Sequence, residues 1–271
     1  MNSSNNSDCP PGVRELEVNR YKNGSLHTSR DFLAQEIPIA LVFNGISHAV
    51  MMATPLDLED FALGFGLTEG LLSSPSELYG IEQRAVEQGI EIHLEVSSAC
   101  EWRLKERRRT LAGRTGCGLC GTDSLSQVRQ KLSPLRAANV DLAAIMKAQR
   151  DLHNWQPLQQ LTGATHAAAW VNGQGEILRA REDVGRHNAM DKLIGDLVRN
   201  KVNPESGFFY ITSRASFEMV QKSIVFGCSV LAAISAPTAF AVELAHAHNL
   251  ALAGYVRGEG LVSYTFKERF V

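Results

Sequence analysis

The sequence has few cysteines, no long hydrophobic run and no excess of charge of either sign. Its 271 residues include 27 Lys and Arg against 29 Asp and Glu, so the net charge of −2 does not favour nucleic acid or an anionic membrane as a partner. No stretch reaches the roughly 18 consecutive apolar residues of a membrane-spanning helix. The polar residues 1–8 lack the basic-then-apolar order of a signal peptide. These absences predict a cytoplasmic protein.

The cysteines are too few and too scattered to form a disulfide framework. They are an odd set of five, namely Cys9, Cys100, Cys117, Cys120 and Cys228. Only two of them are close in sequence, as the CxxC pair of Gly116-Cys117-Gly118-Leu119-Cys120-Gly121. In a reducing compartment such a pair binds metal, exchanges electrons or carries a group more often than it braces a fold.

Several chemistries are open to the pair. A structural zinc site needs two further ligands, and the sequence has no second CxxC and no HxxxH motif. A thioredoxin-type site needs the first cysteine at a helix N-terminus, which Gly118 and Gly121 disfavour. A sulfur carrier needs a reactive thiolate on a mobile loop, which the flanking glycines would supply. Thiols without a chemical role are the remaining alternative.

A basic run precedes the pair. It holds Arg103, Lys105, Arg107, Arg108, Arg109 and Arg114, with Glu106 as the single acid. This positive charge is expected to lower a thiol pKa and to hold a thiolate or an anionic ligand nearby.

The first hundred residues favour strands. Strands are predicted over residues 16–21, 38–43, 46–52 and 89–97, with Asn44-Gly45 as a hairpin turn. A helix is predicted over residues 55–65, with Thr54 as its N-cap and Pro55 in its first turn.

The second half alternates helices with short apolar strands. Helices are predicted over residues 142–158, 184–200, 217–231 and 238–249; strands are predicted up to residue 171 and over residues 176–181, 207–212, 232–236 and 250–256. This order predicts a mostly parallel sheet covered on both faces. We therefore divide the chain into a disordered leader (1–12), an N-terminal α+β domain (13–100), a basic, flexible CxxC loop (101–135) and a C-terminal α/β domain (136–271).

Polar residues follow three of the predicted strands, in the segments 181–188, 212–216 and 235–238. The carboxyl ends of parallel strands are where α/β proteins bind ligands, and helix N-termini there suit phosphates. Capping by Asp183, with Arg186 and His187 on a solvated face, is the structural alternative. His166 is more typical of a packed histidine, because the zinc-deaminase signature H-x-E with P-C-x-x-C is absent. Together the segments predict an anionic, nucleotide-like ligand.

These motifs resemble those of the FdhD/NarQ family, the formate dehydrogenase accessory sulfurtransferases. The resemblance runs from about Val13 almost to the C-terminus. It is carried by Gly113-Arg114-Thr115-Gly116-Cys117-Gly118-Leu119-Cys120-Gly121, Thr165-His166-Ala167-Ala168-Ala169, Glu182-Asp183-Val184-Gly185-Arg186-His187, Ser213-Arg214-Ala215-Ser216-Phe217-Glu218-Met219-Val220-Gln221-Lys222 and Ser235-Ala236-Pro237-Thr238.

The resemblance implies a three-layer α/β/α C-terminal domain, cytidine-deaminase-like but without zinc, beside a smaller N-terminal α+β domain. It implies a homodimer that takes persulfide sulfur from a cysteine desulfurase and delivers it to the molybdenum cofactor, in its bis(molybdopterin guanine dinucleotide) form, for formate dehydrogenase. Such a protein would bind that cofactor as the sulfur acceptor and hold no metal of its own. A non-catalytic chaperone for the same cofactor, with a structural or redox CxxC, is the alternative.

By position, the resemblance makes Cys117 the persulfide carrier and Cys120 its partner. It places cofactor binding in the segment Tyr255, Val256, Arg257, Gly258, Glu259 and Gly260. Relatives usually carry arginine where this chain has Gly260, which leaves Arg257 as the candidate phosphate contact in this segment.

Overall fold

The computed structural model of the chain describes residues 9–111 and 132–271. Cys117 and Cys120 lie outside the described residues. Two parts, each with its own hydrophobic clusters, make up the fold: an N-terminal part (residues 9–111) and a C-terminal part (residues 132–271). The helix Ser98–Leu111 crosses the domain boundary expected at residue 100. The four-way division of the chain stays a prediction.

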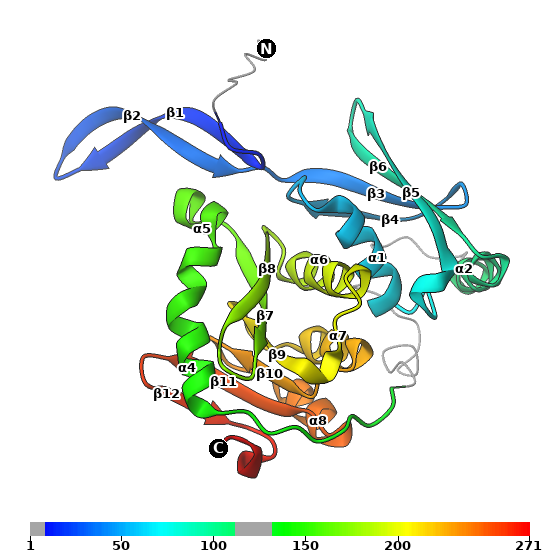
Figure 1. The fold of residues 1–271 in the computed structure, drawn as a ribbon. Coiled ribbons are helices and arrows are strands. Elements are labelled where there is room, and N and C mark those ends of the chain that lie inside the picture. Colours follow the sequence, from blue (N-terminus) through cyan, green and yellow to red (C-terminus); the bar gives the residue numbers. More distant parts are fainter. Residues whose placement is uncertain (1–8, 112–131) are drawn as a thin grey trace.

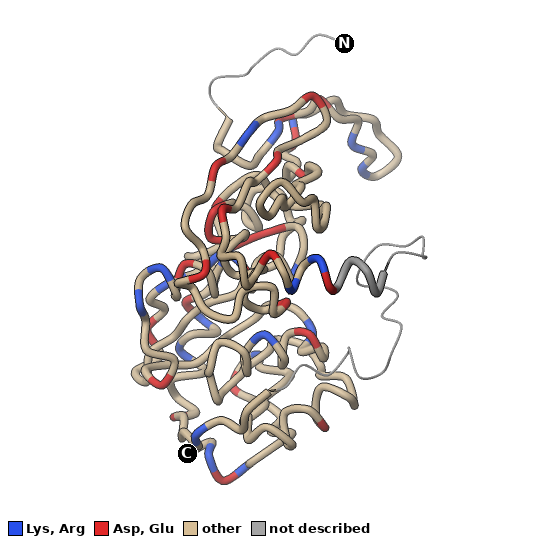
Figure 2. The backbone as a smooth tube through the Cα atoms, turned by 90° about the vertical axis from the view of Figure 1, so that its right-hand side faces the viewer, with Lys and Arg blue, Asp and Glu red and all other residues tan. Residues whose placement is uncertain are grey.

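The N-terminal part contains a separate hairpin and a four-stranded sheet (Figure 1). Its elements are β1 (Val13–Lys22), β2 (Ser25–Ala34), β3 (Ile37–Phe43), β4 (Ile46–Ala53), α1 (Leu58–Thr68), a 3-10 turn (Pro75–Glu77), β5 (Leu78–Val86), β6 (Gly89–Val96) and α2 (Ser98–Leu111). The sheet has the order β4-β3-β6-β5, and its alternating apolar side chains pack on α1. α2 continues this part, and Figure 2 colours its charged positions up to residue 106.

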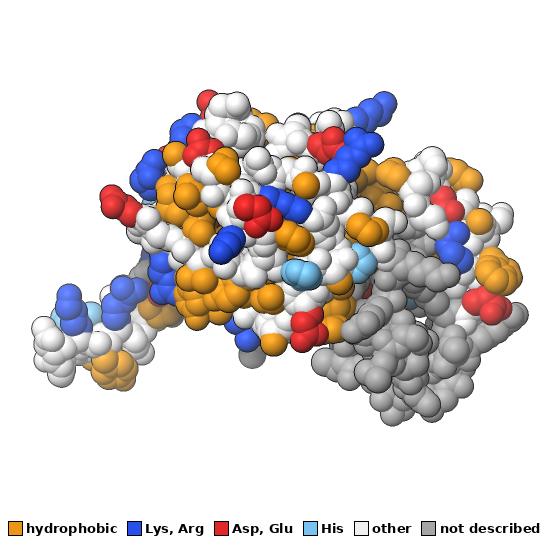
Figure 3. Space-filling view, turned by 90° about the horizontal axis from the view of Figure 1, so that it is seen from below, with side chains coloured by type: hydrophobic (Ala, Val, Ile, Leu, Met, Phe, Trp, Pro, Cys, Tyr) orange, Lys and Arg blue, Asp and Glu red, His pale blue; other side chains and the backbone are white. Residues whose placement is uncertain are grey.

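The hairpin formed by β1 and β2 projects from the rest of the molecule, as Figure 3 shows from below. Tyr21 and Leu26 pair near its tip, and their exposed fractions are 78% and 54%. The second hairpin, β3 and β4, turns at Asn44 and Gly45, whose φ angles are 44° and 76°. Both angles are positive, as the predicted Asn-Gly turn requires.

The C-terminal part is a six-stranded sheet between two layers of helices and loops, which confirms the predicted α/β class. Its elements are α4 (Leu142–Asp151), α5 (Pro157–Thr162), β7 (His166–Asn172), β8 (Ile177–Asp183), α6 (Arg186–Arg199), β9 (Gly207–Ile211), α7 (Phe217–Phe226), β10 (Val230–Ala233), α8 (Ala239–Ala247), β11 (Ala251–Arg257) and β12 (Gly260–Ser263), with short 3-10 turns at Leu152–Trp155, Pro204–Ser206 and Lys267–Arg269.

The sheet order β12-β11-β10-β9-β7-β8 decides where the strand ends meet. The sheet is mixed, so the prediction of a mostly parallel sheet is wrong. β9, β10 and β11 are parallel, whereas β7 is antiparallel to β9, β8 is antiparallel to β7 and β12 is antiparallel to β11. The carboxyl ends of β8, β9, β10 and β11 therefore share one edge with the start of β7. We call this edge the sheet edge.

Alternate side chains along each strand pack against opposite layers. In β9, Phe209 and Ile211 pack against α6, α7 and α8, whereas Phe208 and Tyr210 face the layer that contains α4. This period of two is what a strand buried on both faces requires. In the chain, α6, α7 and α8 come after β8, β9 and β10, so all three helices begin at the sheet edge.

Three predicted boundaries were wrong. α7 ends at Phe226, not at residue 231, because Gly227 adopts the left-handed conformation (φ 97°) that closes a helix, and β10 then begins at Val230. The helix predicted over residues 142–158 divides, since α4 ends at Asp151 and α5 starts afresh at Pro157. α1 starts at Leu58 rather than residue 55. β2, β5, β12 and α2 were not predicted.

The two parts meet where α1 crosses α6. A Cβ atom at Gly64 would lie 1.8 Å from the carbonyl oxygen of Asp191, and one at Gly195 would lie 1.9 Å from that of Asp60. Only glycine lets the two backbones approach this closely. Within the residues described, no helix is long and apolar enough to cross a membrane.

We predict that Gly64→Ala destabilises the protein by about 1–3 kcal/mol or more, because the added methyl overlaps the backbone of α6. The free energy of unfolding, measured with denaturant, checks this. Gly173→Ala is the matched control, since nothing lies within 4 Å of a Cβ atom there. Equal stability of the two variants would contradict this account of the helix crossing.

Candidate functional site

The structure describes only part of the predicted thiol site. Of the basic run, it describes the side chains of Arg103 and Lys105, which pair with Glu77 and Glu101. Arg103 also donates to the carbonyl oxygen of Leu71. These two cations are therefore partly neutralised within the N-terminal part. The effect of the other basic residues on Cys117 stays a prediction.

The predicted cofactor-binding segment forms the end of β11 and the turn into β12. Tyr255 has φ 51°, a conformation that is rare for a bulky residue, at an irregularity in the pairing of β11 with β12. The residue is 41% exposed, and the Arg257 guanidinium carbon lies 5.1 Å from its ring centroid. Gly258, Glu259 and Gly260 are exposed, whereas Val256 is buried. This segment lies at the sheet edge, because β11 ends there.

The segments after β9 and β10 lie side by side at the same edge. Ala215 and Pro237 form a parallel bridge, and the Thr238 amide donates to the Ala215 carbonyl oxygen. The side chain of Thr238 caps α8 by accepting from the amide of Ala241. Arg214 is exposed between these two junctions. The N-termini of α7 and α8 therefore lie next to each other at the sheet edge.

The β8–α6 junction brings histidine and arginine to the edge. His166 of β7 lies opposite Asp183 of β8. Burial lowers the pKa of His166, and the nearby Arg186 and His187 side chains lower it further. Arg186 Nε and His187 Nε2 are buried atoms without a hydrogen-bond partner among the described residues. Both residues are nevertheless only half-buried, so a ligand at the edge can contact the accessible atoms of their side chains.

Glu218, in the first turn of α7, borders this cluster. Its Oε2 atom lies 3.8 Å from His187 Nε2 and accepts a hydrogen bond of 2.8 Å from the hydroxyl of Ser216. His187 is the main cause that lowers the pKa of Glu218 to about 2; burial opposes it and Ser216 assists it. Glu218 thus links the starts of α6 and α7.

Two acids of the predicted ligand motif have structural roles instead. Glu182 accepts hydrogen bonds from the amides of Leu158 and Gln159, so it caps the start of α5. Asp183 is fully buried and forms an ion pair of 2.7 Å with Lys192. No side chain caps α6 at its N-cap residue, Gly185. The capping role considered for Asp183 is therefore wrong, and its carboxylate is not open to a ligand.

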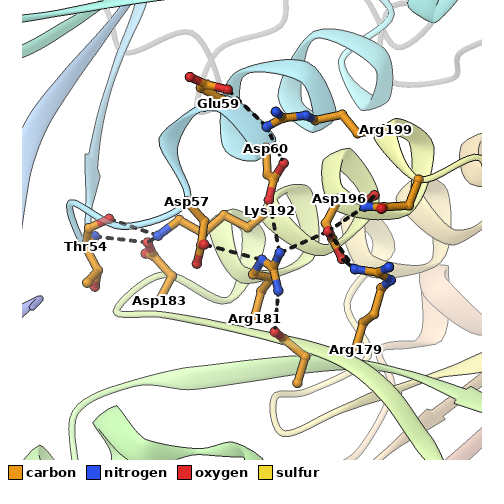
Figure 4. Close-up of polar contacts among 12 residues, drawn as sticks. Thr54, Asp57, Glu59, Asp60, Arg179, Arg181, Asp183, Lys192, Asp196 and Arg199 are labelled. Carbon is orange, nitrogen blue, oxygen red and sulfur yellow. Dashed lines mark hydrogen bonds and ion pairs between the residues drawn. The ribbon is translucent and has the colours of Figure 1, made fainter.

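Thr54 does not have the role predicted for it either. It is buried, and α1 begins four residues later with Asp57 as its N-cap. The Thr54 hydroxyl accepts from the amide of Val184, 130 residues away in sequence. Figure 4 shows dashed lines from Thr54 to both Asp183 and Lys192. Local sequence signals could not reveal this contact, nor those of Lys192 and Glu218, because each depends on how distant elements pack.

The sheet edge has the features that suit an extended anion. Three helix N-termini, those of α6, α7 and α8, open there with Arg186, His187 and Arg214 beside them. From β8 to β11 the edge spans four strand intervals, or about 19 Å. No group of three or more His, Cys, Asp or Glu side chains among the described residues is arranged to hold a metal ion.

We predict that Glu218 stabilises the protein above about pH 5 and that this contribution is lost as the pH falls towards 2. The sign follows because its pKa in the folded protein is lowered from 4.5 to about 2. The stability difference between wild type and Glu218→Gln should therefore be larger at pH 6 than at pH 3 in thermal unfolding. Glu243→Gln, at an exposed position of α8, is the control. A difference that does not shrink at pH 3 would contradict the prediction.

Comparisons with known proteins give the family. The sequence profile described as "FdhD/NarQ family" matches residues 34–271. A protein of Variovorax paradoxus named sulfur carrier protein FdhD is 52% identical over 265 residues, which are 96% of this chain and 95% of that protein. Proteins of the same name from Cupriavidus necator and Chromobacterium violaceum are 52% and 46% identical, over 96% and 98% of this chain and 91% and 100% of theirs.

A crystal structure of a proposed formate dehydrogenase accessory protein from Desulfotalea psychrophila has a similar fold. Its TM-score is 0.77 at 23% identity, over 96% of this chain and all of that chain. The described fold and the predicted family thus agree. The chain belongs to the FdhD/NarQ family.

Proposed function

We propose that the protein is a sulfurtransferase that carries sulfur on Cys117 from a cysteine desulfurase to the molybdenum cofactor, in its bis(molybdopterin guanine dinucleotide) form. The observation that carries this proposal is membership of a family whose similar members are named sulfur carrier protein FdhD, together with the CxxC pair. The sulfurated cofactor would then serve formate dehydrogenase. We further propose that the protein works in the cytoplasm as a homodimer.

The first step is a transfer between thiols. The Cys117 thiolate attacks the terminal sulfur of the donor persulfide, forms a new S–S bond and releases the donor cysteine as a thiolate. The second step converts the carried sulfur to sulfide, which requires two electrons. Attack of the Cys120 thiolate on Cys117 Sγ supplies them: a Cys117–Cys120 disulfide forms and hydrosulfide leaves for the molybdenum. A dithiol reductant of the cell then restores the pair.

The sheet edge is the proposed binding site for the acceptor. The half-buried Arg186 guanidinium and His187 ring suit phosphate oxygens, and the helix N-termini favour negative charge. The segment Tyr255–Gly260 would complete the site at the other end of the edge. Its exposed Arg257 would contact phosphate, and the Tyr255 ring offers a flat surface to a base. The cofactor enters as substrate, so the protein needs no metal of its own.

Cys117→Ala should abolish the activation of formate dehydrogenase, because it removes the atom that carries the sulfur. Formate dehydrogenase activity in cells that lack the native gene measures this, with protein level and unfolding temperature as checks on folding. Cys9→Ala is the matched control, since Cys9 lies outside the CxxC pair. Full activity of the Cys117 variant would exclude the proposed chemistry.

Mass spectrometry distinguishes a sulfur carrier from the alternative, a non-catalytic chaperone for the cofactor. Wild-type protein incubated with a cysteine desulfurase and cysteine should gain the mass of one sulfur atom on the peptide that contains Cys117. A protein that never gains sulfur but still binds guanosine diphosphate would be an escort for the cofactor and not a carrier.

Arg186→Gln should weaken the affinity for guanosine diphosphate about tenfold or more, since it removes a charged donor to phosphate. Isothermal titration calorimetry measures the dissociation constant. Arg84→Gln, on the exposed strand β5, is the control and should bind like wild type. An unchanged affinity for the Arg186 variant would move the phosphate site away from the β8–α6 junction.

A further inference from the structure

The turn that presents Arg186 and His187 is held by a buried carboxylate. Asp183 Oδ1 accepts hydrogen bonds from the amide of Gly185 at 2.7 Å and from Asn188 Nδ2 at 2.9 Å. Its exposed fraction is 0%, and that of Asn188 is 3%. Asp183 thereby fixes the backbone of residues 184 and 185, directly before the two candidate phosphate ligands.

Thr54 of the N-terminal part closes the same turn from outside (Figure 4). Its amide donates to Asp183 Oδ2 at 2.9 Å, and its hydroxyl accepts from the amide of Val184 at 3.2 Å. Its carbonyl oxygen accepts from Lys192 Nζ at 2.9 Å. The amide, hydroxyl and carbonyl groups of this fully buried residue thus each form a hydrogen bond with β8, the turn or α6, and the carbonyl oxygen also accepts from the amide of Leu56. Next to it, the carbonyl oxygen of Met52 accepts from Asn188 Nδ2.

We infer that Thr54 is a positioning residue for the phosphate site: its hydroxyl holds the Val184–Gly185 turn in the conformation that aims Arg186 and His187 at the ligand. The inference rests on the proposed function, because it takes the sheet edge as the binding site. Without the hydroxyl, the amide of the half-buried Val184 loses its protein partner, and the turn is no longer held in place on this side. The N-terminal part therefore completes a site that lies on the C-terminal part.

A purely structural role predicts something different. At the other end of α6, Arg199 also joins the two parts, through Asp60 at 2.9 Å and Glu59 at 3.1 Å. This end lies about 20 Å along the helix from Arg186. If Thr54 only attached one part to the other, loss of the Arg199 contacts should affect ligand binding in the same way as loss of the Thr54 hydroxyl.

The test uses the full chain and guanosine diphosphate as the probe. Thr54→Val keeps the shape of the side chain but removes the hydroxyl, and Thr54→Ser keeps the hydroxyl. Calorimetry should show affinity about three- to tenfold weaker than wild type for Thr54→Val, and within about twofold of wild type for Thr54→Ser and for Arg199→Gln. Unfolding temperatures of the three variants separate lost binding from lost stability. Asn188→Ser, which removes one bond to Asp183 and one to the carbonyl oxygen of Met52 in the N-terminal part, replaces Thr54→Val if that variant does not fold, with the same expected loss.

Two results would overturn the inference alone: Thr54→Val binding as tightly as wild type, or Arg199→Gln losing as much affinity as Thr54→Val. Either leaves the phosphate site in place and makes Thr54 part of the packing only. Failure of the wild-type protein to bind guanosine diphosphate is a different outcome, since it removes the phosphate site itself and the role of Thr54 with it.

Discussion

The buried ion pair between Asp183 and Lys192 is the interaction on which the arrangement of the site depends. Both side chains have an exposed fraction of 0%, and their charged atoms are 2.7 Å apart. Burial lowers the pKa of Lys192, and the Asp183 carboxylate opposes this shift. Loss of one partner would leave an unpaired buried charge, at a cost of about 3–5 kcal/mol. The pair therefore constrains where β8 can end, where α6 can begin and where the backbone of Thr54 must lie.

Helix α6 is shared between the two parts of the protein. Besides the pair at its start, Asp191 in its middle bonds to Thr68 of α1 and to Lys222 of α7, both buried. Burial alone would lower the pKa of Lys222, but Asp191 and Glu69 outweigh it and raise the pKa. The close contacts at Gly64 and Gly195 hold the backbones of α1 and α6 together along this stretch. Because α6 and α7 both begin at the sheet edge, the packing of the N-terminal part bears directly on the geometry of that edge.

Much of the fold could be predicted from local sequence. The buried contacts that hold the site in place, such as those of Thr54 and Asp183, could not. The Asn44-Gly45 turn and the alternating strand β6 are visible in periodicity and turn residues, and the three polar segments after strands were correctly placed on one edge. Thr54, however, follows the sequence rules of an N-cap, and only the packing of β4 against α6 converts it to a contact with Asp183. The same holds for Asp183 itself, which has the sequence of a cap and the environment of a buried ion. The roles of Cys117 and Cys120 rest on the sequence motif and the family.

A carrier of reactive sulfur has to hold its acceptor still while its own thiol moves between two partners. In the proposed mechanism, the sheet edge, which is fixed by buried polar contacts, performs the first task and the cysteine pair performs the second. A crystal structure of the complex with guanosine diphosphate tests the central claim most directly. We predict phosphate oxygens within hydrogen-bonding distance of the Arg186 guanidinium and the His187 ring. A nucleotide bound elsewhere, with neither side chain in contact with phosphate, would contradict this assignment.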